Sequence, residues 1–223
     1  MWCIGEMTGE YLARMEDVLA LYQLPYDDKR PVICLDELPF QMLGEKVAPI
    51  EIKPGDIKKF DYQYVRCGTA AVFVAFEPLT GRRVVSVYPR RTKADYCRFA
   101  QEVADGWAEA EMIILVQDNL NTHHASSFYE NLPPAQAYSL MKRFEFHYTP
   151  KKGSWLNMAE LELSALARQC LARRIPDIET LSSELKAIVR ERNELESKAK
   201  WQFTVENARE KLNRHYGNVI AKT

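Results

Sequence analysis

Residues 112–118 read MIILVQD, an apolar run that closes on a carboxylate. A strand that is apolar at every position is typical of the centre of an α/β sheet, where helices cover both faces. Residues 31–36, PVICLD, have the same character and also end in an aspartate. These two runs predict two buried strands of one sheet.

Other strands and helices are predicted on either side of these runs. Apolar stretches at 68–78 and 82–89, joined by the turn Leu79-Thr80-Gly81, predict a hairpin, and FEFHYT at 144–149 predicts a fifth strand. Helical spacing of apolar residues predicts helices over 9–22, 91–108, 133–144, 156–172, from 175 to about 200, and over 205–216.

The resulting order is β-β-β-α-β-α-β-α, followed by further helices. Strands joined by short turns favour an antiparallel meander, and strands separated by helices favour parallel neighbours through right-handed crossovers. We therefore expect an α/β fold with a mixed five-stranded sheet flanked by helices, which is the order of the ribonuclease-H-like fold. The predicted division is an N-terminal helix and linker (1–30), a core domain (31–175) and a C-terminal helical extension (176–223).

Composition excludes several classes of protein. The 223 residues are 47% hydrophobic and 27% charged, which is typical of a globular chain and not of a disordered or fibrous one. The longest apolar run, 70–76, is far below the roughly 18 residues that span a bilayer, and the first residues lack the pattern of a secretory signal. Five scattered cysteines without a C-x-x-C pair indicate reduced core thiols. We expect a cytoplasmic protein with no membrane partner.

Three carboxylates occupy positions that suit catalysis. Asp36 and Asp118 each end an apolar strand, and the carboxyl ends of neighbouring strands are where ligands of open α/β sheets collect. Two carboxylates so close would repel each other unless a cation neutralised them, and hard divalent cations prefer oxygen ligands. Glu160 shares a helix face with Leu163 and Ala167, so it should face the sheet, whereas Glu162 is predicted to face solvent.

Each acid also has an ordinary structural interpretation. A single aspartate at a strand end is commonly a turn former or a helix cap. Glu160 could pair with Arg168 or favour the start of its helix. His123 and His124 follow Asp118 in a polar loop, where they could contact phosphate or a water near the site, or simply be solvated.

Basic residues cluster locally although the net charge is −1. The stretch GRRVVSVYPRRTKA at 81–94 contains no acid, and a second group follows the predicted fifth strand. These clusters predict polyanion contacts, or alternatively the solvated ends of a strand pair. The candidate contacts are Arg82, Arg83, Arg90, Arg91, Lys93, Lys151 and Lys152.

Three motifs around the acids resemble those of DDE transposases. They are LDE at Asp36, VQDNLNTHH at Asp118 and YTPKKGSWLNMAE at Glu160. The similarity is strongest to the bacterial insertion-sequence branch of the mariner superfamily. It extends through the opening WCIGEMTGEYLARMEDVLALY, YVRCGTAAVFVAFEPLTGRR, ELELSALARQCLARRIPD and the closing WQFTVENAREKLNRHY.

This resemblance implies a metal-dependent DNA endonuclease and strand-transfer enzyme. Asp36, Asp118 and Glu160 would be catalytic and would hold Mg²⁺ or Mn²⁺, two ions in all, so that the enzyme cuts transposon ends and joins the freed 3′-hydroxyl to target DNA. It further implies the basic residues above as DNA contacts, Trp155 as a base-stacking or core residue, and a homodimer or higher assembly on DNA near the bacterial nucleoid. Supporting positions around the metal site would be Asn119, Asn121, His123 and Asn157.

The sequence also departs from the family pattern. The 41 residues between Asp118 and Glu160 exceed the usual spacing, and Lys152 stands where relatives carry a histidine. Transposases of this kind begin with a helix-turn-helix region that recognises transposon ends, and we expect this chain to represent the catalytic part without it. The helix at 9–22 would then be a linker stub or a dimer contact. The alternatives are a non-catalytic DNA-binding or dimerising remnant that inhibits the full-length enzyme, and a nuclease for RNA–DNA hybrids or junctions.

Overall fold

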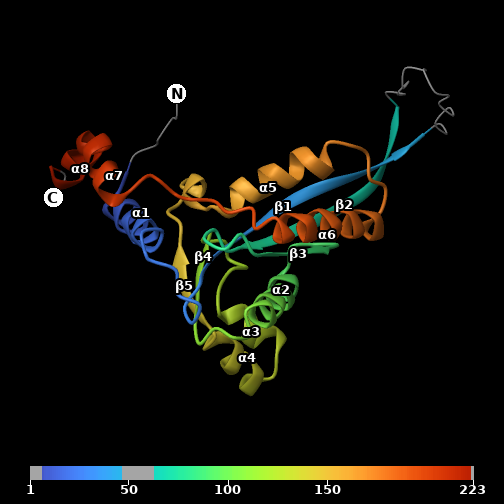
Figure 1. The fold of residues 1–223 in the computed structure, drawn as a ribbon, viewed down its shortest axis with the longest axis horizontal. Coiled ribbons are helices and arrows are strands. Elements are labelled where there is room, and N and C mark those ends of the chain that lie inside the picture. Colours follow the sequence, from blue (N-terminus) through green and yellow to red (C-terminus); the bar gives the residue numbers. More distant parts are fainter. Residues whose placement is uncertain (1–6, 47–62, 222–223) are drawn as a thin grey trace.

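The computed structural model describes residues 7–46 and 63–221, so Cys3 and the start of the opening motif lie outside the described residues. Its centre is a five-stranded sheet in the order β3-β2-β1-β4-β5 (Figure 1). The strands are β1 (Val32–Glu45), β2 (Tyr64–Phe76), β3 (Arg83–Tyr88), β4 (Ile113–Gln117) and β5 (Phe144–Tyr148). β1, β2 and β3 form an antiparallel meander, and β4 and β5 run parallel to β1. The predicted mixed sheet is confirmed.

β1 is longer than predicted. The sequence suggested an end at Asp36, but the strand continues to Glu45 because residues 37–45 pair with β2. Beyond Pro39, which lies level with the end of β3, the two strands leave the sheet as a two-stranded ribbon (Figure 1). Asp36 is therefore inside a strand, two residues beyond the last pair that β1 makes with β4.

One face of the sheet is covered by α2 (Lys93–Gly106), α3 (Ser126–Asn131) and α4 (Pro134–Met141). Thr92 begins α2 with a capping box, in which its side chain and that of Asp95 satisfy each other's backbone N–H groups. Alternate residues of the central strands, such as Ile33 and Leu35, are fully buried against these helices, with Phe99 and Trp107 among their partners.

The opposite face carries the remaining helices. α1 (Gly9–Leu21) and α7 (Val205–Lys211) share a buried cluster with Cys34 and Val116. α5 (Ala159–Leu166), the π-helical turn η2 (Ala167–Leu171) and α6 (Ile178–Glu194) pack on β2 and β3. The last elements are the 3₁₀ turn η1 (Ser154–Leu156) and α8 (Asn213–Ile220). Helices therefore cover both faces, as the apolar strands predicted, and the three-part division of the chain stays a prediction.

The structure corrects the interpretation of Glu162. We expected it to face solvent, but only 2% of its side chain is exposed. Its carboxylate accepts hydrogen bonds from Arg192 at 2.7 and 2.9 Å and lies 3.1 Å from Nε of the buried Arg83. The reason is tertiary: α6 covers the side of α5 that points away from Glu160, so an acid there is buried and needs cationic partners.

The structure bears on two predictions from composition, those on membrane spans and on the cysteines. Among the helices of the described part of the chain, none has the length and apolar character needed to cross a membrane. The four cysteines within it are free, and Cys34, Cys97 and Cys170 are buried as predicted. Cys67 differs, because it is exposed on the ribbon.

Candidate functional site

Asp36 and Asp118 extend from neighbouring parallel strands. Cys34 of β1 is level with Val116 of β4, so the two aspartates occupy equivalent positions two residues further along. Side chains alternate along a strand, so both aspartates point to the face where Cys34 and Val116 are buried. The prediction that these two strands are neighbours is confirmed.

Glu160 reaches the same face from the first turn of α5. The turn before this helix is tied to β1 by the buried Asn157, whose amide donates to the Leu35 carbonyl at 2.8 Å. The Asn157 side-chain oxygen accepts from the Ala159 N–H at 3.1 Å, and its carbonyl accepts from the Glu160 N–H. Asn157 thus ties the start of α5 to Leu35, the residue that precedes Asp36.

The pKa of Asp36 responds to the other two acids. Burial raises the pKa of Asp36 to about 7, and the negative charges of Glu37, Asp118 and Glu160 add to this increase. The Glu37 N–H, which donates to Asp36 Oδ1 at 2.8 Å, opposes it only partly. Holding Asp36 ionised is therefore unfavourable without a cation nearby.

His123 is the second neighbour that the fold places beside the acids. Its ring is 1% exposed, with Nδ1 2.5 Å from Asp118 Oδ1 and Nε2 3.2 Å from Glu37 Oε2. Burial lowers its pKa, but hydrogen bonds and charge from Asp118 and Glu37 outweigh burial and raise the pKa to about 9. A protonated His123 therefore donates to Asp118 and fixes the direction of that carboxylate. Of the two interpretations from sequence, solvation is wrong for this histidine.

Glu37 was missed by sequence reasoning. Its side chain is 3% exposed and lies between His123 and Arg91, whose guanidinium is 3.7 Å away. Its position directly after Asp36 was the available signal, but neighbouring residues of a strand face opposite sides, so no pattern could assign it to the same site. The imidazole of His123 bridges the two sides.

The basic stretch 81–94 is divided by the topology. Arg83 is level with Phe76 and Cys34, whereas the chain after Tyr88 emerges at the end of the sheet that carries Asp36. Arg90, Arg91 and Lys93 therefore lie toward the acids, where Lys93 pairs with Glu130. Arg82 is at the other end, paired with Glu109 at 2.6 Å. Arg83 is buried beside Glu162 and Asn193, so the structure contradicts a phosphate contact for it.

The remaining predicted residues fall around the same edge. Lys151 and Lys152 are exposed in the turn after β5, and Asn119 and Asn121 are exposed in the loop after Asp118. Trp155 packs in the way that the core interpretation expects: its ring stacks on Trp201 with 6.3 Å between centroids and meets Phe203 edge-on with 6.0 Å between centroids. Within the described ranges, no three His, Cys, Asp or Glu side chains already stand close enough to enclose a metal ion.

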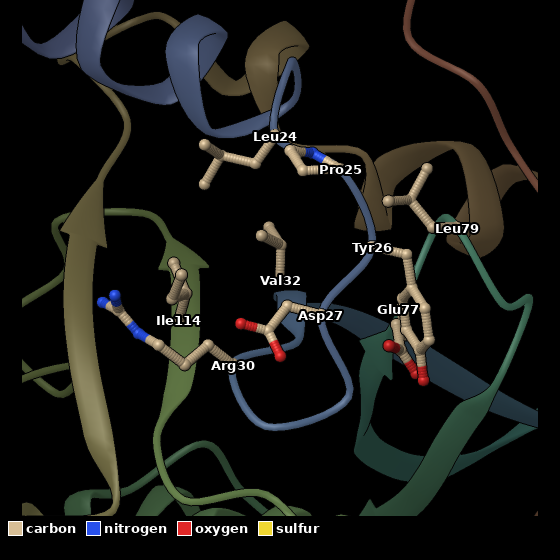
Figure 2. A pocket seen from close by; sticks show the side chains of 9 residues that line it. All are labelled: Leu24, Pro25, Tyr26, Asp27, Arg30, Val32, Glu77, Leu79 and Ile114. Carbon is tan, nitrogen blue, oxygen red and sulfur yellow. The ribbon is translucent and has the colours of Figure 1, made fainter.

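A cavity of about 170 Å³ lies apart from these residues (Figure 2). Leu24, Pro25, Val32 and Ile114 are among the side chains around it. Val32 begins β1 and pairs with Ile114, so this cavity is at the amino end of the strands, opposite the acids. It is not part of the acidic site.

Comparison with known families finds one match that covers more than half of the chain. Residues 31–182 match the family described as DDE superfamily endonuclease, a span that includes Asp36, Asp118 and Glu160. Comparison with curated protein sequences yields no match.

Solved structures of the Mos1 mariner transposase have a similar fold. The Mos1 mariner paired end complex with Mn is 13% identical with a TM-score of 0.58, and the match covers 99% of this chain and 65% of that one. The Mos1 strand transfer complex is 15% identical, with a TM-score of 0.56 and coverage of 99% and 64%. The paired end complex with Mg is 14% identical with a TM-score of 0.54, and the match covers 99% of this chain and 65% of that one. This chain therefore spans about two thirds of the length of these proteins and shares their ribonuclease-H-like fold.

Proposed function

This chain belongs to the DDE superfamily endonucleases, and from that membership we propose that it cleaves DNA with Asp36, Asp118 and Glu160 and joins the freed 3′-hydroxyl to target DNA, as a transposase does. The observation that carries the proposal is that burial, together with the charges of Asp118 after β4 and Glu160 on α5, raises the pKa of Asp36 on β1 to about 7. The structurally similar Mos1 proteins were solved as a paired end complex and a strand transfer complex, which supports the proposal that this chain acts on DNA.

The donor set fits divalent cations. Carboxylate oxygens are the ligands that Mg²⁺ and Mn²⁺ prefer, and a cation would relieve the unfavourable charge of Asp36. We propose that Asp36, Asp118 and Glu160 hold two such ions, and that the side chains draw together when the ions bind. Bound cations would supply Lewis-acid polarisation of the phosphodiester and activation of the attacking hydroxyl.

The neighbours of the acids set their orientation. His123 donates to Asp118 and leaves the second carboxylate oxygen of that residue for a ligand. Asn157 holds the start of α5 against the Leu35 carbonyl and thereby sets the position of Glu160. Mutation of such partners of metal-binding side chains commonly lowers metal affinity or activity by roughly 10–100-fold.

DNA would approach across the edge that carries the acids. Arg90, Arg91, Lys151 and Lys152 are exposed there and can neutralise phosphates without reading bases. Arg83 is excluded by its burial, and Arg82 lies at the far end of the sheet. Assembly of two or more copies on DNA remains a proposal, to be checked by analytical ultracentrifugation with and without a DNA duplex.

A nicking assay tests the catalytic proposal. Supercoiled plasmid is incubated with the protein and Mg²⁺ or Mn²⁺, and a labelled duplex with a free 3′-hydroxyl reports strand joining. We expect nicked and joined products that disappear with EDTA and in Asp118→Asn. If wild type and Asp118→Asn bind DNA equally and neither makes products, the chain is a DNA-binding remnant. If Asp118→Asn still makes these products, the acids are not required for catalysis.

A further inference from the structure

A groove of about 410 Å³ lies next to Asn119, the residue that follows Asp118, and is separate from the cavity in Figure 2. One wall is α1 and the residue before it, a second is the loop after β4, and the third is the turn after β5. The residues that line it are Thr8, Glu10, Tyr11, Arg14, Asn119, Pro150, Lys151 and Lys152. Asn119 directly follows Asp118, so the groove opens next to the proposed catalytic site.

The walls of the groove are joined to one another by hydrogen bonds. The Tyr22 hydroxyl at the end of α1 donates to the Leu156 carbonyl at 2.7 Å, and the Trp155 indole N–H donates to the Tyr11 hydroxyl at 3.3 Å. The Thr149 N–H donates to the Gln117 carbonyl at 2.9 Å, which ties the end of β5 to the end of β4. The groove is therefore formed before any ligand arrives, and α1 is part of its wall.

The turn after β5 keeps its shape at a conformational cost. Lys152 has a φ of 64°, in the left-handed region that non-glycine residues rarely adopt. Gly153 donates its N–H to the Pro150 carbonyl at 2.8 Å, and a Cβ on Gly153 would lie 2.6 Å from Pro150 Cγ. Strained backbone of this kind tends to occur at functional sites, and here it presents two adjacent lysines to the groove.

The charge of the groove is positive. Lys151 and Lys152 are exposed and form no ion pair with any residue that the structure describes. Arg14 is held by Glu10 at 2.8 Å, with Glu10 far more exposed than Arg14. Three cations and one acid give the lining a formal charge of +2 in a chain whose net charge is −1. Compact ammonium groups beside amide and hydroxyl donors suit a phosphodiester backbone.

We propose that this groove binds the sugar–phosphate backbone of the DNA strand next to its scissile bond. Lys151 and Lys152 neutralise two phosphates, Arg14 and Asn119 donate to the same strand, and Glu10 limits the affinity by competing for Arg14. This inference rests on the proposed function, because the groove is lined by the residue that follows Asp118. It gives α1 a role in substrate binding instead of that of a linker stub or a dimer contact.

The test measures how salt affects DNA binding without catalysis. Fluorescence anisotropy with a labelled 30-base-pair duplex in EDTA compares the full chain with Lys151→Gln/Lys152→Gln. Loss of two phosphate contacts should lower the slope of log Kd against log salt by about 1.8, which is about 60-fold in affinity at 0.1 M salt if the curves meet near 1 M. The matched control is Lys186→Gln/Arg190→Gln, which removes two exposed cations of α6 and should keep the wild-type slope.

A second variant is expected to change DNA affinity in the opposite direction. Glu10→Gln releases Arg14 from its ion pair and should tighten DNA binding, a gain that loss of structure cannot produce. Wild-type slopes in the double lysine variant, or equal losses in the α6 control, would overturn the proposal and leave the groove to another ligand such as an acidic protein segment. Plasmid nicking by the same proteins keeps the two questions separate: the groove proposal can fail while Asp118-dependent nicking persists, and the reverse.

Discussion

Replacing Asp36 with asparagine should stabilise the metal-free protein at alkaline pH. The ordinary pKa of an aspartate is 3.8, and burial with three neighbouring acids raises that of Asp36 to about 7. Below pH 3.8 the carboxyl is protonated in both the folded and the unfolded chain, so its raised pKa does not lower the free energy of unfolding. Between the two values the unfolded chain ionises while the folded protein keeps its proton, and the free energy of unfolding falls until pH 7 is passed.

The size of the effect follows from the two pKa values. At 1.36 kcal/mol per pH unit, the ionisation of Asp36 costs about 1.7 kcal/mol at pH 5 and about 4 kcal/mol at pH 8.5. Asparagine keeps the shape and an oxygen that can accept from the Glu37 N–H, but it never ionises. The gain in stability of Asp36→Asn over wild type should therefore grow by about 2–3 kcal/mol between these pH values.

Urea unfolding in EDTA at the two pH values measures this difference directly. The control is Asp105→Asn, which removes an exposed aspartate from α2 and should change stability little at either pH. A constant difference between Asp36→Asn and wild type at pH 5 and 8.5 would refute the reasoning. It would mean that the folded protein holds Asp36 ionised without penalty, and the argument for a cation at this site would lose its electrostatic basis.

Three further outcomes are expected. Mg²⁺ at 100 times its Kd should raise the thermal midpoint of wild type at pH 8.5 by about 5–10 °C, since such binding contributes about 2.7 kcal/mol, and calorimetry should show no rise for Asp118→Asn. Glu162→Gln should cost about 3–5 kcal/mol in urea unfolding because Arg83 is left charged and buried, whereas Arg83→Met/Glu162→Leu should recover most of this loss; equal losses would contradict the ion-pair explanation. His123→Ala should slow plasmid nicking about 10-fold or more at unchanged DNA affinity, because the imidazole positions Asp118, and a matching fall in affinity would speak against that role.

The strands of the core were predictable because their signal is local. Uniformly apolar runs specify β4 and the first half of β1, and the helical segments between β3, β4 and β5 require parallel crossovers. The second half of β1 was not predicted, since Pro39 and Gly44 interrupt its pattern. Its stability as a strand comes from β2, which pairs with it from Tyr64 onward. Pairing with a distant segment leaves no mark in the local sequence.

Side-chain environments were harder to predict for a similar reason. Helical periodicity assigned Glu160 to the side of the acids, which the pKa of Asp36 supports, but it placed Glu162 in solvent. Periodicity states which residues share a face and not what covers each face. Arg192, thirty residues further along, supplies the cover and the charge that bury Glu162. Arg83 was misassigned by the same limitation, because its partner is Glu162.

The two groups of buried charge in this fold differ in how they are balanced. Glu162 is matched by Arg83 and Arg192, and this cluster holds α5 and α6 to β3. Around Asp36 the acids Glu37, Asp118 and Glu160 converge, and the cations nearest to them in the described residues, His123 and Arg91, reach Glu37 and Asp118 instead of Asp36. A buried acid that the protein leaves without a cationic partner reduces stability, so it persists where something outside the chain compensates it. The missing charge beside Asp36, and not the mere presence of three acids, is therefore the main reason for our proposal that divalent cations and phosphates bind at this edge of the sheet.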